Sequence, residues 1–374
     1  MERIPVAILG ATGTVGQKFI TLLHEHPYFT IRELVASPRN EGKTYREACA
    51  WKQNTTIPSE IASMKLKTTS TPLSSTILFS GLDSSVAGEV ESNYADQGHI
   101  IISNSKNHRM DPTVPLVIPE INPDHFALLA DQRWKGGVIT NSNCSTMFLA
   151  MALAPIEETF GITAVQVSTM QAISGSGYPG VPSYDIIGNV IPYISGEEEK
   201  MEEETQKILG TLVDNRIQDA EFAVSAQCNR VPVVDGHTET ISVGLREKAT
   251  PEEVSRVMAA FRGLPQKLQL PSAPPQPLLL MDEADRPQPA RDVWLENGMA
   301  TLVGRIRTCP VLDIRMVVLG HNTVRGAAGA AVLNAEALYK LGLLGENPAR
   351  EINMLQFKQR AAALHDTHAL IGQR

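Results

Sequence analysis

Residues 141–147 read Asn-Ser-Asn-Cys-Ser-Thr-Met and hold a side chain suited to nucleophilic chemistry, the thiol of Cys144. The cysteine follows Asn143, which can cap a helix, and precedes an apolar run over 147–153 that predicts one. A thiol at a helix start lies at the positive end of the helix dipole, which lowers its pKa and favours the thiolate. The same pattern fits a buried cysteine that acts as a small hydrophobic residue. This segment alone does not separate the two interpretations.

Two further segments carry side chains that could act beside such a thiol. Arg230 and His237 stand seven residues apart in Asn-Arg-Val-Pro-Val-Val-Asp-Gly-His, just before a predicted strand, so both can reach one cleft. Histidine suits acid–base work, and the arginine fork suits a carboxylate. Gln171 begins the loop Gln-Ala-Ile-Ser-Gly-Ser-Gly, whose small residues allow close approach of a ligand such as a nicotinamide. Taken singly, a surface histidine, a structural ion pair and an ordinary turn are the favoured explanations of these segments.

A glycine-rich turn near the N-terminus predicts a dinucleotide site. Residues 4–9 form a continuous apolar run, as in a strand buried on both faces of a parallel sheet. Gly10, Gly13 and Gly16 follow, ahead of a helical pattern. Glycines at this junction let the backbone turn tightly and approach a pyrophosphate, whose charge then rests on the helix N-terminus. The alternative interpretation is a simple strand-to-helix turn.

The end of the next strand indicates which dinucleotide binds. An NAD site usually has an acidic residue there for the ribose hydroxyl, whereas a 2′-phosphate calls for arginine. The sequence at 35–39 offers Ser37 and Arg39 and no carboxylate. Glu33, inside the predicted strand, is the acidic rival. The pattern favours NADP.

Composition and charge exclude several classes of protein. The chain has 374 residues, 43% hydrophobic and 20% charged, with a net charge of -8. This length favours two domains, and the acidic balance disfavours a nucleic-acid or anionic-membrane partner. The four cysteines lack a C-x-x-C spacing or a regular framework, which argues against a zinc site or a disulfide scaffold. We expect a soluble, cytoplasmic protein without a bound metal.

Hydrophobic patterns divide the chain into two regions. The first alternates strands with helices, which predicts a doubly wound α/β domain. Its predicted elements are strands at 4–9, 31–36, 77–80 and 100–103 and a helix at 84–97. After about residue 160, longer strand-like alternation predicts a second domain on a largely antiparallel sheet. Its predicted elements are strands at 164–170, 239–246, 300–307 and 312–319, a charged helix at 197–207, a long ordered or semi-ordered proline-rich loop within 265–289, and helices at 324–341 and from about 351.

Several motifs occur along the chain in an order shared with one enzyme family. Four are the glycine turn and the segments around Cys144, Gln171 and His237. The others are Asp-Arg-Pro-Gln-Pro at 285–289, Val-Gly-Arg-Ile-Arg at 303–307 and Gly-His-Asn-Thr-Val-Arg-Gly-Ala-Ala at 320–328. Together they resemble aspartate-β-semialdehyde dehydrogenases of the archaeal and fungal branch. The resemblance implies an α/β protein with a Rossmann-like dinucleotide-binding domain and an α+β catalytic and dimerisation domain with a mostly antiparallel sheet.

The resemblance also implies a reaction. Cys144 would attack β-aspartyl phosphate and carry the acyl group as a thioester, which a hydride from NADPH would convert to aspartate semialdehyde. Gln171 would orient the substrate, and His237 would take the thiol proton and later return one. Backbone N–H groups at the helix start or Asn143 are the expected oxyanion donors.

Charged residues supply the expected substrate contacts. Arg230 would bind the α-carboxylate and Glu204 the amine of the substrate, with Glu202 and Glu203 as adjacent alternatives on the same helix. The side chains expected at the phosphate are Arg109, Asn143 and Lys207.

The expected cofactor contacts lie on the glycine turn, the strand ends and two later loops: Gly10, Thr12, Gly13, Thr14, Val15, Ser37, Arg39, Ser80, Ser103, Ser174, Gly175 and Asn322. The late helix would pack back on the first domain. The resemblance therefore implies a discontinuous NADP-binding domain, 1–142 and 323–374, around a catalytic and dimerisation domain, 143–322. It also implies a homodimer or homotetramer, and it leaves the role of loop 271–289 open.

Three other functions compete with this one. A malonyl-CoA reductase would share the fold and the thioester chemistry, but its substrate has no amine for Glu204. An N-acetyl-glutamyl-phosphate reductase typically reads Gly-Cys-Tyr-Pro-Thr around its cysteine, unlike Ser-Asn-Cys-Ser-Thr here. A non-catalytic NADP-binding sensor would need no complete set of Cys144, Gln171, Arg230 and His237.

Overall fold

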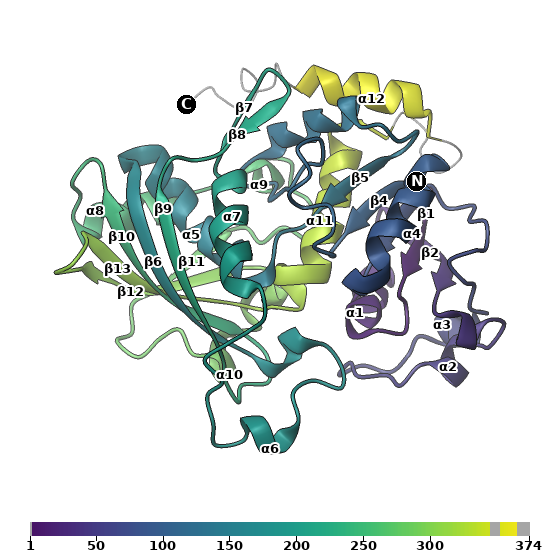
Figure 1. The fold of residues 1–374 in the computed structure, drawn as a ribbon, viewed down its shortest axis with the longest axis horizontal. Helices are drawn as coiled ribbons and strands as arrows, with labels where there is room; N and C mark the ends of the chain where they lie inside the picture. Colours follow the sequence, from purple (N-terminus) through teal and green to yellow (C-terminus); the bar gives the residue numbers. More distant parts are fainter. Residues whose placement is uncertain (1, 345–351, 365–374) are drawn as a thin grey trace.

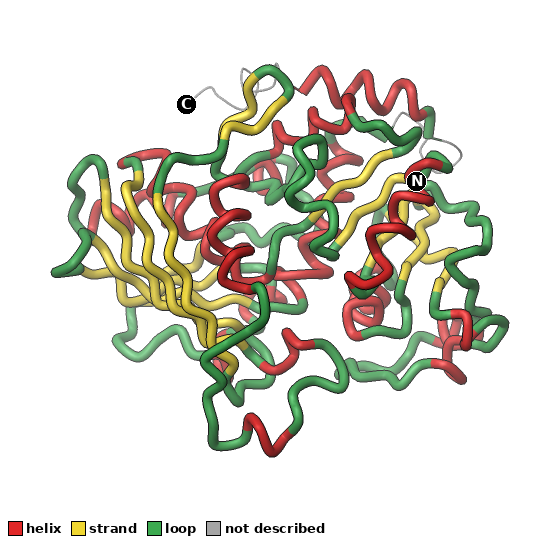
Figure 2. The backbone as a smooth tube through the Cα atoms, viewed as in Figure 1, coloured by secondary structure: helices red, strands yellow, loops and turns green. Residues whose placement is uncertain are grey.

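The computed structural model describes residues 2–344 and 352–364. Two sheets stand side by side, and helix α11 (Gly329–Lys340) lies between them (Figure 1). Figure 2 shows that helices and loops, rather than strands, form the junction between the two sheets. The predicted two-part α/β and α+β architecture is therefore confirmed.

The N-terminal part of the chain, up to Thr140, forms a parallel five-stranded sheet in the order β2-β1-β3-β4-β5. Its strands are β1 (Ile4–Leu9), β2 (Phe29–Val35), β3 (Ile77–Ser80), β4 (Ile100–Ser103) and β5 (Gly137–Thr140). The predicted strands match these closely, except that β2 begins and ends earlier than 31–36. Strand β5 was not predicted, because Gly-Val-Ile-Thr has two consecutive large apolar residues where β3 and β4, of the same length, each have three.

The second sheet has six strands in the order β11-β12-β13-β10-β6-β9. The strands are β6 (Ile162–Gln171), β9 (Ala223–Arg230), β10 (His237–Leu245), β11 (Leu278–Met281), β12 (Thr301–Thr308) and β13 (Ile314–Gly320). The inner pairs are antiparallel, as expected, but both edge strands, β9 and β11, pair in parallel. A small hairpin, β7 (Thr211–Val213) and β8 (Arg216–Gln218), lies apart from this sheet.

The helices cover the sheets and connect them. The longer ones are α1 (Thr14–Leu23), α4 (Ser84–Asp96), α5 (Cys144–Phe160), α7 (Glu197–Ile208), α8 (Pro251–Ala260), α11 and α12 (Met354–Ala362). Short ones are α2 (Tyr45–Ala48), α3 (Ser59–Ser63), α6 (Ser183–Ile186), α9 (Leu264–Lys267) and α10 (Pro289–Asp292). Further 3₁₀-helical segments occur at Pro38–Asn40, Pro123–Asp131, Ile173–Ser176 and Leu295–Gly298. The helix expected from about 351 begins at Met354 among the described residues; residue 351 itself lies outside them.

The late helical segment packs on the first sheet. Residues Val324–Ala328 form a π-helical turn that leads into α11. Val324, Ala328 and Leu333 share one apolar core with Ile8 and Phe79 of the parallel sheet. A π-turn adds a residue to the helix and is common at functional sites. Its Gly326 fits tightly, because an added Cβ would lie 2.9 Å from Cys144 Cβ.

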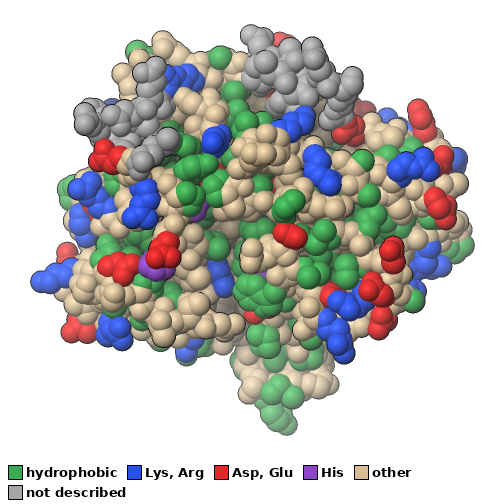
Figure 3. Space-filling model, turned by 180° about the vertical axis from the view of Figure 1, so that it is seen from behind, with side chains coloured by type: hydrophobic (Ala, Val, Ile, Leu, Met, Phe, Trp, Pro, Cys, Tyr) green, Lys and Arg blue, Asp and Glu red, His purple; other side chains and the backbone are tan. Residues whose placement is uncertain are grey.

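Two long connections have different characters. The proline-rich loop is ordered, as predicted: it contributes the edge strand β11, and Ser272 donates through its N and Oγ to Glu336 on α11. Residues 177–196, which we call the arm, instead project from the body around α6 (Figures 1 and 3). Among the described residues, no helix has the length and apolar character that a bilayer span requires.

Candidate active site

Helix α5 begins at Cys144, and Asn143 caps it. The Oδ1 atom of Asn143 accepts hydrogen bonds from Ser145 N at 2.8 Å and Thr146 N at 3.1 Å. The predicted position of the thiol at a helix N-terminus is therefore confirmed. The cap also occupies two of the amides that the sequence offered as oxyanion donors, so in this state they point to Asn143 rather than to a ligand.

The ring of His237 lies between Cys144 and the backbone of Ala172. His237 is the first residue of β10 and is fully buried, with its Nε2 atom 3.2 Å from Cys144 Sγ. Its Nδ1 atom accepts a hydrogen bond from Ala172 N at 3.0 Å. An amide can only donate, so Nδ1 carries the lone pair and a neutral ring carries its proton on Nε2. His237 therefore faces the thiol as a hydrogen-bond donor. The sequence instead predicts that it accepts the thiol proton.

Burial decides the resting charges of this pair. It raises the pKa of the Cys144 thiol to about 12, with Glu197 adding to the rise and Arg230, Arg109 and Lys200 opposing it. Burial, with Arg230 and His321, also holds the pKa of His237 well below its usual value. The ligand-free site thus holds a neutral thiol and a neutral imidazole. The helix start does not offset the loss of water around the sulfur, contrary to the expected low thiol pKa.

One peptide unit holds two of the candidate residues. The N–H of Ala172 fixes His237, and its carbonyl accepts a hydrogen bond from Arg230 Nη1 at 2.7 Å. Gly175, three residues on, approaches both side chains: an added Cβ would lie 2.9 Å from Arg230 Nη1 and 3.0 Å from His237 Nε2. The small residues of this loop are therefore needed for close approach to protein side chains, not only to a ligand.

Gln171 ends β6 directly beside Arg230, the last residue of β9. The Gln171 side chain is buried, and its Nε2 donates to Thr169 Oγ1 at 3.3 Å. The parallel pairing of β6 with β9 therefore brings the expected orienting residue and the expected carboxylate ligand to the same end of the sheet.

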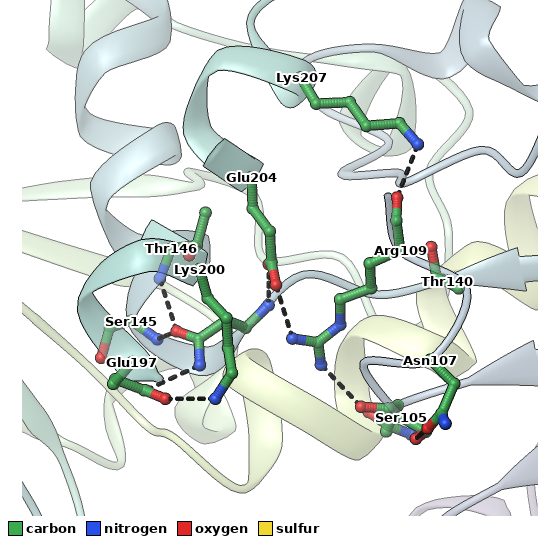
Figure 4. Close-up of polar contacts among 12 residues, drawn as sticks. Ser105, Asn107, Arg109, Thr140, Ser145, Thr146, Glu197, Lys200, Glu204 and Lys207 are labelled. Atoms are coloured by element: carbon green, nitrogen blue, oxygen red, sulfur yellow. Dashed lines mark hydrogen bonds and ion pairs between the residues drawn. The ribbon is translucent and has the colours of Figure 1, made fainter. Parts of the chain in front are cut away.

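Helix α7 turns one face toward the start of α5 (Figure 4). The residues on it are spaced by three or four positions, which places them on one side of a helix: Glu197, Lys200, Glu204 and Lys207. Glu197 accepts from Asn143 Nδ2 at 2.7 Å and pairs with Lys200 at 3.0 Å. The cap of α5 is thereby tied to α7.

The structure separates the three adjacent glutamates of α7. Glu204 is buried and accepts from Arg109 Nη1 at 2.9 Å and from Asn143 N at 2.6 Å. Glu202 instead accepts from Ala226 N on the free edge of β9, and Glu203 is exposed. Of the three, Glu204 alone reaches the other candidate residues. Its contact with a substrate amine stays a prediction.

Arg109 and Lys207 are both engaged in this ligand-free state. The Arg109 Nη2 atom donates to Asn104 O at 2.7 Å, while its buried Nε has no partner among the described residues. Lys207 Nζ donates to the carbonyl oxygens of Arg109, Asp111 and Val114 at 2.6, 2.8 and 3.1 Å. These bonds use all three of its protons. A phosphate contact for Lys207 would therefore require one of the bonds to break.

A cleft lies beside the glycine turn. Its volume is about 640 Å³, and it is lined by Thr14, Lys18 and Ser174 together with Tyr178, Asp235 and Thr323. In the turn, an added Cβ at Gly10 would lie 2.7 Å from Gly81 O, and one at Gly16 would lie 2.3 Å from Gly10 O. Gly13 is the residue before α1, with Thr12, Thr14 and Val15 around it partly exposed. The turn thus has the close packing and open helix start that a pyrophosphate needs.

The expected ribose-phosphate residues are accessible, and their acidic rival is not. Ser37 and Arg39 are exposed after β2. Glu33 is buried and accepts from Lys67 Nζ and from the amides of Ser74 and Ser75. Burial alone would raise the pKa of Glu33, but these bonds hold it at about 2. Because its carboxylate is bonded within the fold, Glu33 is not available to bind the ribose hydroxyl of NAD.

Three expected cofactor contacts have other partners. Ser80 and Ser103 are fully buried, and both hydroxyls donate to Glu91 Oε1, at 2.6 and 2.7 Å. Their side chains point toward Glu91 of α4, so only their backbone atoms are available to contact a cofactor. That contact stays a prediction. Asn322 accepts from Gly236 N at 2.9 Å and donates to Ser174 Oγ at 2.8 Å. It therefore joins the late helix to the loop after β6.

Two contributors were not predicted from the sequence. Glu197 carries a signal that could have revealed it, since it lies seven residues before Glu204 on the same face of a helix. Ala172 carries none, because its role belongs to its backbone. Among the described residues, no group of three or more His, Cys, Asp or Glu is arranged to hold a metal ion.

Comparisons with known proteins agree with this geometry. Residues 5–129 match a family model described as semialdehyde dehydrogenase, NAD binding domain, and residues 153–325 match semialdehyde dehydrogenase, dimerisation domain. Aspartate-semialdehyde dehydrogenase of Schizosaccharomyces pombe is 50% identical, covering 91% of this chain and 99% of the relative. That of Methanothermobacter thermautotrophicus is 46% identical, covering 90% and 99%. A crystal structure of the Candida albicans enzyme with NADP has 42% identity and a TM-score of 0.84, covering 90% and 99%. The chain belongs to the aspartate-semialdehyde dehydrogenase family.

Proposed function

We propose that the chain catalyses the NADPH-dependent conversion of L-β-aspartyl phosphate to L-aspartate 4-semialdehyde and phosphate, a step toward lysine, threonine, methionine and isoleucine. The observation that carries the proposal is the thiol of Cys144 at a capped helix start, 3.2 Å from His237 Nε2. Arg230 and the Arg109–Glu204 pair flank it. A nucleophile between two cationic forks suits a substrate with a carboxylate at one end and a phosphate at the other.

In the first step, the Cys144 sulfur attacks the acyl carbon, the carbon–oxygen bond to phosphate breaks, and a thioester forms. Because His237 presents a proton on Nε2, the thiol proton leaves with the departing phosphate as hydrogen phosphate. Arg230 binds the α-carboxylate, Gln171 orients the acyl group, and Arg109 receives the phosphate. The unpaired Nε of Arg109 supports this last role.

In the second step, the thioester gains a hydride, the carbon–sulfur bond breaks as the aldehyde forms, and the departing sulfur takes a proton from solvent, so that Cys144 is again a thiol. NADPH, when bound, supplies the hydride. The Nε2–H of His237 keeps its proton and donates a hydrogen bond to the sulfur or to the oxyanion that develops beside it. Asn322 and Ser174 hold the loop that shapes the nicotinamide end of the cleft.

The residues around the cleft fit NADP. The glycine turn cannot accept side chains at Gly10 or Gly16, and Arg39 is accessible for a 2′-phosphate. We assign the cofactor domain to 1–142 and 323–374 and the catalytic domain to 143–322. The shared core of the parallel sheet with residues 324–344 supports this discontinuous division.

Assembly and location belong to the same proposal. We infer a homodimer or homotetramer built through the domain that matches the dimerisation model. We also infer a cytoplasmic location, supported by four cysteines that are all unpaired.

The rivals make separate predictions in one assay. The enzyme should reduce NADP when it is given aspartate semialdehyde and phosphate. It should not reduce NADP when it is given malonyl semialdehyde and coenzyme A. Activity with malonyl-CoA instead would favour the reductase alternative. Binding of NADP without any turnover would favour the sensor.

A further inference from the structure

A buried ion pair joins the late helical segment to the loop between β4 and β5. Arg325 Nη2 lies 2.7 Å from Glu120 Oε2, and the two side chains are 1% and 0% exposed. The same Nη2 atom lies 3.5 Å from the Sδ atom of Met151 on α5. None of the steps proposed for the reaction uses this pair. Charges buried this deeply cost free energy unless they are paired and hydrogen-bonded, so the pair requires an explanation.

The hydrogen-bonding groups of the pair are only partly satisfied. Within residues 2–344 and 352–364, the Nε and Nη1 atoms of Arg325 and the Oε1 atom of Glu120 have no hydrogen-bond partner. Replacing a buried ion pair by apolar residues of similar volume is often neutral or stabilising, because it removes the cost of taking both charges out of water. A contribution to stability is therefore a poor explanation of the pair. Its one strong contact instead fixes where residue 325 lies relative to residue 120.

Arg325 belongs to the π-helical turn, Val324–Ala328, which forms a wall beside the candidate nucleophile. An added Cβ on Gly326, the next residue, would lie 2.9 Å from Cys144 Cβ and 3.2 Å from Cys144 Cα. The backbone of the turn is therefore in close contact with the first residue of α5. Met151, the other contact of Arg325, lies on the same helix, seven residues after Cys144. Arg325 thus connects the turn both to Glu120 and to the helix that carries the thiol.

We propose that Arg325 and Glu120 are positioning residues, which hold the π-helical turn against Cys144 and so fix the 3.2 Å contact between Cys144 Sγ and His237 Nε2. The kinetic consequence of this inference rests on the proposed function. Neither Arg325 nor Glu120 touches the substrate, and both act through the backbone of Gly326. A displacement of about 1 Å at a reacting group can lower a rate by about a hundredfold, so a wall this close to the nucleophile affects the chemistry.

The test is the double variant Arg325→Met/Glu120→Leu, which removes both charges together and leaves apolar side chains in their place. The variant should unfold at or above the temperature at which wild type unfolds, since no buried charge is left unpaired. Its kcat should fall by about tenfold or more while KM changes by less than about threefold, because the residues expected to bind substrate are untouched. A pair that only stabilised the fold would not produce this difference between kcat and KM.

Alkylation of Cys144 by iodoacetamide gives a second measurement, which needs no substrate. Burial raises the pKa of the thiol and keeps it protonated in the ligand-free enzyme. A turn that is free to move admits water to the sulfur, which favours the thiolate. At a fixed pH of about 8, the rate of alkylation should therefore rise by about fivefold or more in the double variant.

The matched control is the double variant His26→Phe/Glu336→Gln. It removes another buried pair, His26 Nε2 to Glu336 Oε1 at 2.8 Å, which holds the late helical segment at α11. Phenylalanine can keep the stacking of His26 on Phe29, and glutamine keeps an oxygen for the hydroxyl of Ser272. Because this pair has no contact with the π-helical turn, the control should change neither kcat nor the alkylation rate.

The remaining outcomes overturn the inference in separate ways. Unchanged kcat and alkylation in Arg325→Met/Glu120→Leu would show that the pair does not position Cys144. Equal changes in the control would show a general effect of the late segment. If the double variant fails to fold while the control folds, the pair serves stability instead. If wild type shows no turnover with aspartate semialdehyde and phosphate, the proposed reaction fails, and the alkylation rates still decide whether the pair positions the thiol.

Discussion

The start of α5 and the edge strand β9 each carry a cysteine near Glu197: Cys144, which is partly buried, and Cys228, which is buried. Burial raises the pKa of Cys144 and of Cys228 to about 12, and Glu197 adds to both rises. Their neighbours differ: Cys144 Sγ lies 3.2 Å from His237 Nε2, whereas Cys228 Sγ lies 3.6 Å from Met201 Sδ. Cys144 also stands at a helix start, whereas Cys228 stands within a strand that packs against α7. The pKa therefore does not distinguish a nucleophile from a packing residue.

A third cysteine sharpens the same point. Although burial opposes it, hydrogen bonds from the amides of Leu312 and Val311 lower the pKa of Cys309. Cys309 follows β12 at the end of the sheet away from His237. A choice based on pKa alone would select the wrong thiol. What Cys144 has, and Cys228 and Cys309 lack, is a histidine beside the sulfur and a position at a helix N-terminus.

The largest expected difference between Cys144 and Cys228 should appear when each sulfur is replaced by oxygen. Cys144→Ser should lower kcat by at least about a thousandfold, because a hydroxyl is a far weaker nucleophile without a base. Cys228→Ser should retain most of the activity and lose about 1–3 kcal/mol of stability, since a hydroxyl would be buried beside Met201. Steady-state rates and urea unfolding measure the two effects. Comparable losses of activity at both positions would remove the distinction.

The donor beside the sulfur can be tested with two amides. His237→Gln can place an N–H where Nε2 lies, whereas His237→Asn keeps an acceptor for Ala172 but no donor for sulfur. If His237 acts as a donor, the Gln variant should stay within about tenfold of wild type in kcat/KM and the Asn variant should fall about a hundredfold or more. Equal and severe losses in both would instead require a proton-accepting ring, as the sequence first suggested.

The raised thiol pKa predicts the pH dependence of alkylation. In ligand-free enzyme, Cys144 is protonated below its folded pKa of about 12, and raising the pH deprotonates it. Its rate of modification by iodoacetamide should rise about tenfold per pH unit from about pH 7 to about pH 10, since the thiolate is the reactive form. Peptide mapping separates it from Cys228 and Cys309. A plateau beginning below pH 8 would show that the helix start, not burial, sets the charge.

The features of this site that depend on local sequence patterns could be predicted. The glycine turn, the helix at Cys144 and the strand ends at Gln171 and His237 all follow from periodicity and from residues with narrow backbone or chemical uses. Assigning Glu204 rather than Glu202 needed the tertiary structure, because the free edge of β9 attracts Glu202. That strand was itself missed: in Ser-Ala-Gln-Cys-Asn the buried positions hold only the small residues Ala226 and Cys228, so the alternation carries a weak apolar signal.

The remaining differences concern hydrogen bonds between distant segments. Ser80 and Ser103 stand at strand ends, where a ligand contact is a sound expectation, but Glu91 from α4 takes both hydroxyls. The proton on His237 Nε2 follows from the amide of Ala172, which no side-chain pattern encodes. Burial of Cys144 likewise depends on packing by Gly326 from the far end of the chain. Residue types indicated which groups meet, and packing decided which atoms face each other.

The smallest expected effect concerns the cap that sets Cys144 apart from Cys228. Asn143→Ala removes the acceptor for two amides and the donor to Glu197, so it should cost about 1–3 kcal/mol of unfolding free energy. Thr250→Ala on α8 removes an exposed cap remote from the cleft and should cost about 1 kcal/mol without changing kcat. Urea unfolding gives both values, and a several-fold fall in kcat is expected for Asn143→Ala alone. If the two caps prove equivalent in stability and rate, Asn143 acts only as a helix cap, and the thiol owes its position to the packing of Gly326 and His237 instead.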